Sequence, residues 1–236
     1  MKRDEILQAM IDHSRSLFVR NYTYSTGGNL SHRFADGFLI TATNTSFGRL
    51  APTDFVYCTL DGEPAPGEAL KPSKEAAFHA AIFRRRPEVN AVLHLHSPGA
   101  IALSAMAEPT DDGNVLPAVT SGSITRVGRL PLLPYIKPGA AELAARVEAA
   151  CTGVNGMLLE NHGIVTYAPT LDQAVDITEE AEQNVKVWLL SGGTARILTD
   201  AEVAEVKPLY GAAVAPGAQA PRLRRPLPGM GGGAVL

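Results

Sequence analysis

Cysteine is scarce in this chain of 236 residues: only Cys58 and Cys151 occur, and neither belongs to a Cys-x-x-Cys pair. The sequence therefore indicates neither a disulfide framework nor a thiolate metal site, and a reducing, cytoplasmic setting is expected. Long apolar runs are also absent, because no stretch reaches the roughly 18 apolar residues that a membrane-spanning helix needs. The N-terminal residues lack the apolar core of a secretory signal. No membrane partner is predicted.

Charge of one sign is not concentrated anywhere in the sequence. Twenty-one lysines and arginines oppose 24 aspartates and glutamates, giving a formal net charge of −3 without long runs of either sign. This balance argues against nucleic acid as a partner. What is present is apolar content, since hydrophobic residues make up 45% of the chain, enough for one large α/β domain. We assign this domain to residues 1–210 and predict that the Gly- and Pro-rich residues 211–236 form a flexible tail.

Periodicity and turn residues predict a mixture of helices and strands. Apolar residues three and four positions apart predict a helix over residues 4–19. Ser73 and Pro87 are the residue types that begin and end a second helix, and Thr170 begins a long one. Further helices are expected over residues 97–106, 141–151 and from 199 onward, and strands over residues 30–34, 38–43, 54–60, 90–96 and on both sides of 160–163.

The most informative strand carries two histidines one residue apart. Side chains of a strand alternate between its faces, so His94 and His96 should project from the same side. A buried pair of imidazoles needs partners, and one divalent metal ion would satisfy both neutral rings. Two hydrogen-bonded core histidines are the alternative that this short pattern leaves open.

A third histidine and a carboxylate favour the metal interpretation. His162 lies in a polar break between two apolar strands, directly before Gly163, which allows the backbone to bend. Glu75 lies near the start of the second predicted helix, and His79 follows one turn later. That spacing is compatible with a Glu/His metal pair and with an ordinary packed residue. Three histidines with an exchangeable fourth position are typical of catalytic zinc sites.

Small polar residues gather in three loops. Residues 25–31 contain paired glycines, residues 43–46 are four small hydrogen-bonding residues, and a Ser-Lys pair precedes Glu75. Backbone N–H groups and hydroxyls in such loops could hold an anion, although each loop alone could equally be an ordinary turn. The candidate anion-binding residues are Gly28, Asn29, Thr43, Asn44, Ser73 and Lys74.

Taken together, these motifs resemble those of the class II aldolase/adducin family over roughly residues 4–206. The matching segments are GGNLS (27–31), LITATN (39–44), PSKE (72–75), RPEVNAVLHLH (86–96) and NHG (161–163). The Thr-Asn-Thr-Ser run, the Lys-Glu pair and residues 127–135 look most like the 3-oxo-tetronate 4-phosphate decarboxylase branch. L-Fuculose phosphate aldolase belongs to the same group.

The resemblance implies a fold and a set of roles. The expected fold is a three-layer α/β/α sandwich around a largely antiparallel central sheet, in a homotetramer with sites at subunit interfaces. His94, His96 and His162 would bind Zn²⁺, or another divalent metal such as Mn²⁺ or Co²⁺, and Glu75 would act as acid and base. The six loop residues named above would hold the phosphate of a small-molecule substrate.

Two departures from the family bear on the reaction. Asn44 stands where the aldolases commonly have glycine, and residues 120–123 hold no tyrosine where family members carry one as an acid. Water, Glu75 or Tyr210 from a neighbouring subunit would have to supply that proton. We expect residues 120–123 and the substrate loops to decide which bond breaks.

The expected function is that of a zinc-dependent lyase acting on a small phosphorylated sugar acid. It would decarboxylate a 3-oxo-tetronate 4-phosphate-like substrate through a metal-stabilised enolate. The first alternative is an aldolase that cleaves a fuculose phosphate-like ketose phosphate to dihydroxyacetone phosphate and an aldehyde. The second is a non-catalytic, adducin-like domain, which the retention of three histidines and Glu75 disfavours.

Overall fold

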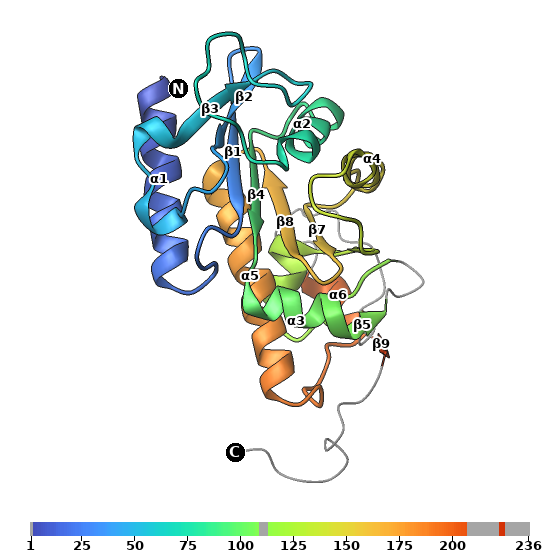
Figure 1. Ribbon diagram of the computed structural model, residues 1–236. Coiled ribbons are helices and arrows are strands. Elements are labelled where there is room, and N and C mark those ends of the chain that lie inside the picture. Colours follow the sequence, from blue (N-terminus) through green and yellow to red (C-terminus); the bar gives the residue numbers. More distant parts are fainter. Residues whose placement is uncertain (1, 109–112, 207–221, 225–236) are drawn as a thin grey trace.

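The computed structural model describes residues 2–108, 113–206 and 222–224 (Figure 1). Within these residues, one sheet has the strand order β3-β2-β1-β4-β8-β7-β6. Neighbouring strands pair antiparallel, except for the parallel pair of β6 and β7. The largely antiparallel sheet is therefore confirmed. Its strands are β1 (Asn29–Phe34), β2 (Gly37–Thr41), β3 (Phe55–Cys58), β4 (Ala91–Leu95), β6 (Leu132–Leu133), β7 (Gly156–Leu159) and β8 (Gly163–Ala168).

Helices cover both faces of the sheet. Apolar side chains of α1, α3 and α5 belong to one core cluster and those of α2 and α4 to another, with the sheet between them (Figure 1). The predicted three-layer α/β/α arrangement is confirmed. The helices are α1 (Arg3–Val19), α2 (Ala76–Arg85), α3 (Pro98–Met106), α4 (Ala141–Ala150), α5 (Leu171–Leu190) and α6 (Asp200–Val206), with 3₁₀ turns at Phe47–Arg49 and Pro52–Asp54.

Strand alternation decides which face carries the site. Leu93 and Leu95 of β4 belong to the core on the α1, α3 and α5 side, whereas Val92 belongs to the core on the α2 and α4 side. His94 follows the same alternation as Val92, and its ring meets Phe78 of α2 edge-on at a centroid distance of 5.7 Å. The candidate histidines therefore lie on the α2 side of the sheet.

The start of α2 corrects one prediction. Ser73 is not the N-cap residue, because Glu75 holds that position and the helix begins at Ala76. Ser73 instead donates its N–H to the carbonyl of Thr41, and its hydroxyl oxygen accepts the N–H of Glu75 at 3.3 Å. These bonds hold the chain against the end of β2, so a turn precedes the helix. Glu75 consequently lies at the N-cap position of α2 rather than inside its first turn.

Two further segments differ from the predictions. Ser123–Val127 forms a short π-helical segment where no helix was expected. Within the predicted tail, β9 (Arg222–Leu223) pairs with β5 (Ala107–Glu108), and Leu223 packs against the core on the α1, α3 and α5 side. The rest of residues 207–236, including Tyr210 and the predicted boundary at residue 210, lies outside the described residues. None of the described helices is long and apolar enough to cross a membrane.

A candidate metal centre beside an anion pocket

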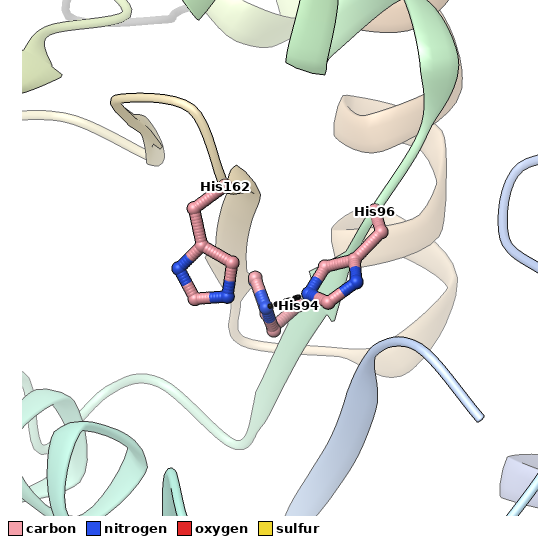
Figure 2. Close-up of side chains that lie close together, drawn as sticks. All are labelled: His94, His96 and His162. Carbon is pink, nitrogen blue, oxygen red and sulfur yellow. Dashed lines mark hydrogen bonds between the residues drawn. The ribbon is translucent and has the colours of Figure 1, made fainter. Parts of the chain in front are cut away.

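Three histidines from two separate segments converge at the end of β4 (Figure 2). His94 is the fourth residue of β4, His96 lies one residue beyond its end, and His162 lies in the hairpin between β7 and β8. The Nε2 atoms of His94 and His96 are 3.0 Å apart. The ring centroids of the three histidines are separated by 4.8, 4.9 and 5.0 Å, and one ring nitrogen from each lies within 4.8 Å of the others.

The hairpin that carries His162 needs two unusual backbone positions. Asn161 adopts a left-handed conformation with φ of 53°, which asparagine tolerates better than most residues. A Cβ atom added at Gly163 would lie 2.3 Å from the carbonyl oxygen of Leu95. Gly163 therefore allows β8 to pack closely against β4. The bend that was predicted at this glycine occurs at Asn161 instead.

Burial and hydrogen bonding prepare the histidines as ligands. The Nδ1 atom of His94 lies 2.9 Å from the carbonyl oxygen of Ile164, so Nδ1 donates and Nε2 keeps its lone pair. Burial lowers the pKa of His94 to about 3, and burial also lowers the pKa of His96. Neutral imidazoles are the form that binds metal ions.

Glu75 borders the histidine cluster. Its Oε1 lies 3.2 Å from His162 Nε2 and its Oε2 lies 3.4 Å from His94 Nε2. Burial by itself would raise the pKa of Glu75, but the imidazoles of His94 and His162 and the amide of Asn29 outweigh burial and hold that pKa below its usual range. The carboxylate is therefore ionised at neutral pH.

A buried oxygen of Glu75 that lacks a hydrogen bond fits a divalent cation. Oε1 of Glu75 borders the cluster, yet it has no hydrogen-bond partner in the described part of the chain. Buried polar atoms are nearly always satisfied, so such orphans call for a ligand or water. Three imidazole nitrogens and one carboxylate oxygen are a donor set that suits zinc and related metals. The group formed by His94, His96 and His162 can therefore bind a metal ion.

A cavity of about 360 Å³ opens beside this cluster. Its lining joins the three polar loops to the cluster, because Glu75 and His96 form part of its wall. Every residue predicted to bind the anion lines this one cavity: Gly28, Asn29, Thr43, Asn44, Ser73 and Lys74. The fold therefore brings three loops that are separate in sequence to one cavity.

The cavity offers donors suited to an anion. The backbone N–H groups of Gly28, Asn44 and Lys74 donate to no protein acceptor within the described residues. Gly28 and Asn44 have positive φ values of 85° and 61°, a conformation that occurs in backbone nests for anions. Lys74 is exposed and adds a positive charge at the rim. Asparagine is the residue after glycine best suited to a left-handed position, which accounts for Asn44 where the aldolases commonly have glycine.

Two side chains have contacts that the sequence did not indicate. The amide of Asn29 is occupied, because Nδ2 donates to Glu75 Oε2 at 2.8 Å and Oδ1 lies 2.5 Å from His79 Nε2. His79 also contacts the hydroxyl of Ser31 and does not belong to the histidine cluster. Of the two interpretations of the Glu75–His79 spacing, the packed residue is the one observed.

Two buried carboxylates near the site were missed by sequence reasoning. Glu182 of α5 accepts hydrogen bonds from the chain segment directly after His96. Glu160, two residues before His162, accepts the N–H of Tyr135 at 2.7 Å and pairs with Arg224. Glu160 directly precedes the NHG motif. No local signal marks Glu182, because its partners are more than 80 residues away.

Residues 120–123 lie away from the cavity in this chain. The N–H and hydroxyl of Thr120 contact Asn184 Oδ1 of α5, and Gly122 lies against Glu180. None of these four residues lines the cavity beside the histidines. They pack on the α5 side of the sheet, so the structure of the single chain does not support the expectation that they shape the site.

Comparison with known proteins identifies the family of this chain. Residues 8–189 match the family described as Class II Aldolase and Adducin N-terminal domain. The chain belongs to this family. The family is metal-dependent, and its members that resemble this chain include a 3-oxo-tetronate 4-phosphate decarboxylase from Haemophilus influenzae, 36% identical over 202 residues. That match covers 85% of this chain and 95% of the relative.

Other class II aldolase family members extend the comparison. An L-fuculose phosphate aldolase from Haemophilus influenzae is 32% identical over 182 residues, covering 77% of this chain and 81% of the relative. Among solved structures, YgbL from Klebsiella pneumoniae, described as an aldolase/epimerase/decarboxylase, superposes with a TM-score of 0.81 at 35% identity, covering 87% of this chain and 99% of that one. An L-fuculose 1-phosphate aldolase gives a TM-score of 0.77 at 28% identity, covering 88% and 96%. Relatives with these names are lyases, and this chain is a lyase of the class II aldolase family.

Proposed function

We propose that the chain is a zinc-dependent decarboxylase of a small phosphorylated 3-oxo sugar acid of the 3-oxo-tetronate 4-phosphate kind. One observation carries the proposal: the histidine cluster and the anion-binding loops border the same cavity. Glu75 and His96 line it together with Lys74 and with the backbone N–H groups of Gly28 and Asn44, which donate to no protein acceptor among the described residues. A substrate held there by its phosphate would reach the histidine cluster with its other end. The relatives named as 3-oxo-tetronate 4-phosphate decarboxylases supply the substrate class.

The chain's own residues would divide the work. Lys74 and the N–H groups of Gly28 and Asn44 would bind the phosphate and orient the substrate. A divalent cation at the histidine cluster would supply Lewis acidity at a carbonyl oxygen next to the bond that breaks. As carbon dioxide leaves, the electron pair of the broken carbon–carbon bond passes to that carbonyl oxygen and forms an enolate. The enolate needs one proton at the carbon that carried the carboxylate. Glu75, ionised and bordering the cluster, is suited to take this proton from water and to deliver it to that carbon.

The donor set favours zinc as the metal. Three imidazole nitrogens with a position open to substrate are typical of catalytic zinc, whereas Mg²⁺ and Ca²⁺ prefer sites built from oxygen ligands. Mn²⁺ and Co²⁺ accept the same ligands and remain alternatives. A homotetramer with sites at subunit interfaces stays a prediction from the family resemblance.

An aldolase is the second candidate, supported by the 32% identity to an L-fuculose phosphate aldolase. In that reaction a ketose phosphate loses an aldehyde, and a proton must first leave a substrate hydroxyl. Decarboxylation needs no such proton transfer, which is why the chain without a tyrosine at residues 120–123 favours it. A non-catalytic, adducin-like domain would have no need for the orphaned oxygen of Glu75 beside three histidines.

Substrate assays would separate these functions. Zinc-loaded protein is incubated with a 3-oxo-tetronate 4-phosphate and, separately, with L-fuculose 1-phosphate, while carbon dioxide and aldehyde are measured. Release of carbon dioxide alone supports the proposal, aldehyde alone supports the aldolase, and neither supports the adducin-like domain. Glu75→Gln should lower kcat at least 100-fold on the true substrate. Lys74→Met should raise KM about tenfold with a smaller effect on kcat.

The metal assignment has its own test. Metal analysis of His94→Ala should show zinc falling from about one ion per chain to well below that ratio. Full occupancy in this variant would contradict the assignment. His32→Gln, which changes a histidine of β1 outside the cluster, is the matched control and should retain the metal.

The source of any further proton can be tested at two exposed tyrosines. Tyr24 lines the cavity, and the backbone of Tyr135 is held by Glu160, close in sequence to His162. Comparing Tyr24→Phe with Tyr135→Phe distinguishes them, because only loss of the acting hydroxyl lowers kcat. If neither variant is impaired, the proton comes from Glu75, water or residues outside the described part of the chain.

A further inference from the structure

A further buried histidine, His79, is connected to Glu75 through the side chain of Asn29. His79 has no exposed surface, and its ring stacks on Phe78 at 4.7 Å with an interplanar angle of 16°. Its Nε2 lies 2.5 Å from Asn29 Oδ1, and its Nδ1 lies 2.6 Å from the hydroxyl of Ser31. Asn29 in turn donates to Glu75 Oε2 at 2.8 Å. Four buried side chains therefore form one continuous hydrogen-bonded series that ends at the Glu75 carboxylate.

The chemistry of the four groups fixes the direction of every bond. An ionised carboxylate only accepts hydrogen bonds, so the amide nitrogen of Asn29 must face Glu75 and the amide oxygen must face His79. That oxygen also only accepts, so Nε2 of His79 must carry the proton. Complete burial lowers the pKa of His79 to about 3 and keeps the ring neutral. Nδ1 is then unprotonated and accepts the hydroxyl proton of Ser31.

Regular secondary structure carries both halves of the series. Asn29 and Ser31 are two residues apart on β1, so their side chains lie on one face of the strand. Glu75 and His79 are four residues apart at the start of α2, so they too share one face. The series therefore ties the first turn of α2 to the central sheet next to the histidine cluster. A carboxylate held in this way presents one oxygen to Asn29 and leaves Oε1 without a protein hydrogen bond, bordering the cluster.

We propose that His79 is a positioning residue, which acts through Asn29 to fix the orientation of the Glu75 carboxylate beside the candidate metal centre. The proposal rests on the proposed role of Glu75 in proton transfer. In this proposal the side-chain amide of Asn29 connects His79 to Glu75 and does not bind the phosphate. The proposal also requires a single tautomer of His79, protonated at Nε2, which can be observed without any substrate.

The first test is spectroscopic and does not depend on activity. In protein labelled with ¹⁵N at histidine and ¹³C at the glutamate carboxyl, His79 should show the Nε2–H tautomer both with and without zinc. Assignment uses His79→Gln and Glu75→Gln. In His79→Phe the carboxyl resonance of Glu75 should shift, whereas in His32→Gln it should not. An Nδ1–H tautomer, or a Glu75 resonance unmoved by His79→Phe, would overturn the proposal.

The second test is kinetic. His79→Phe removes both hydrogen bonds and should lower kcat about 10- to 100-fold, because a displaced catalytic group loses its alignment. KM and zinc content should change less than twofold, since the three clustered histidines and the proposed phosphate donors of Gly28, Asn44 and Lys74 are unchanged. His79→Gln keeps an N–H donor in place of Nε2 and should recover most of the lost kcat. If both variants are impaired equally, the donated bond is not what matters and the positioning role fails.

Ser31→Ala is a milder variant that tests the same series if His79→Phe does not fold. It removes only the outer bond of the series and should lower kcat by a factor of about 2 to 5. If His79→Phe does not fold, the tautomer measurement and the comparison of His79→Gln with Ser31→Ala still decide the proposal. If the wild type turns over neither substrate, the proposed function fails, while the tautomer and the Glu75 resonance still report on the positioning contacts.

Discussion

Glu182 holds the chain directly beyond the histidine pair, and its removal should have a large and measurable effect. The carboxylate has no exposed surface and accepts three hydrogen bonds of 2.8 Å, from the hydroxyl of Ser97 and the N–H groups of Gly99 and Ala100. These are the cap residue and the first turn of α3. Lys186, one turn along α5, lies 3.4 Å from the same carboxylate.

The size of the effect follows from the donors left behind. Glu182→Ala would strand three buried donors, and each unsatisfied buried group costs about 1 to 3 kcal/mol. Some water would enter the vacated space, so we expect a loss of about 3 to 5 kcal/mol in the free energy of unfolding. Glu182→Gln keeps the shape of the side chain and one accepting oxygen, but it places an amide nitrogen against at least one of the three donors. Its expected loss is about 1 to 2 kcal/mol.

Urea unfolding of metal-free protein at pH 7 and fixed protein concentration measures these losses. Lys186→Met is the matched control, because this lysine is partly exposed and its removal leaves the three N–H and O–H donors satisfied. It should cost less than about 1 kcal/mol. Because Ser97 follows His96 directly, release of this segment should also weaken zinc binding about tenfold in Glu182→Ala.

Two results would refute this reasoning. A loss below about 1 kcal/mol in Glu182→Ala would mean that the three donors find other partners without strain. A loss in Lys186→Met as large as that in Glu182→Ala would mean that the ion pair, and not the helix cap, carries the stability.

Three further predictions concern backbone strain, close packing and pH. Asn44→Gly should change the free energy of unfolding by less than about 0.5 kcal/mol, whereas Asn44→Ala should lower it by about 1 kcal/mol, because alanine is strained at a φ of 61°; urea midpoints compare the two. Gly163→Ala places Cβ against the Leu95 carbonyl and should cost about 1 to 3 kcal/mol and reduce zinc occupancy, and full occupancy at unchanged stability would contradict the packing argument. His79 stays neutral in the folded chain down to about pH 3 but takes up a proton near pH 6.5 when unfolded, so its contribution is present above pH 6.5 and is lost as the pH falls. Metal-free wild type should therefore lose about 2 kcal/mol more than His79→Gln between pH 7 and pH 5, and equal losses would show that His79 is protonated in the folded state.

Local rules were enough for much of the fold and for the pairing of His94 with His96. The alternation of a strand placed His94 and His96 on one face, because a period of two residues is a property of the backbone alone. Thr170 caps α5 as predicted, since the N–H that its hydroxyl accepts belongs to Gln173, three residues away. The polar break between two apolar strands indicated His162, turn residues indicated the three polar loops, and the structure gathers these loops around one cavity.

Other features depend on contacts that no local pattern records. The start of α2 was predicted two residues early, because Ser73 bonds to the end of β2 and delays the helix. The side chain of Asn29 was assigned to the anion, but His79 and Glu75, 50 and 46 residues away in sequence, occupy both ends of its amide. Glu182 reaches partners more than 80 residues distant.

The sequence by itself determined that His94 and His96 share one face of their strand, that three loops are rich in small polar residues, and the family to which the chain belongs. These features follow from the two-residue alternation of strands, the residue types of turns and the order of the motifs, all of which are local properties of the sequence. Only the tertiary structure decided which atoms of these residues are free and which are occupied. Hydrogen bonds between distant segments form only when the sheet is assembled. They occupy the amide of Asn29 and leave Oε1 of Glu75, beside the histidines, without a hydrogen bond from any described residue.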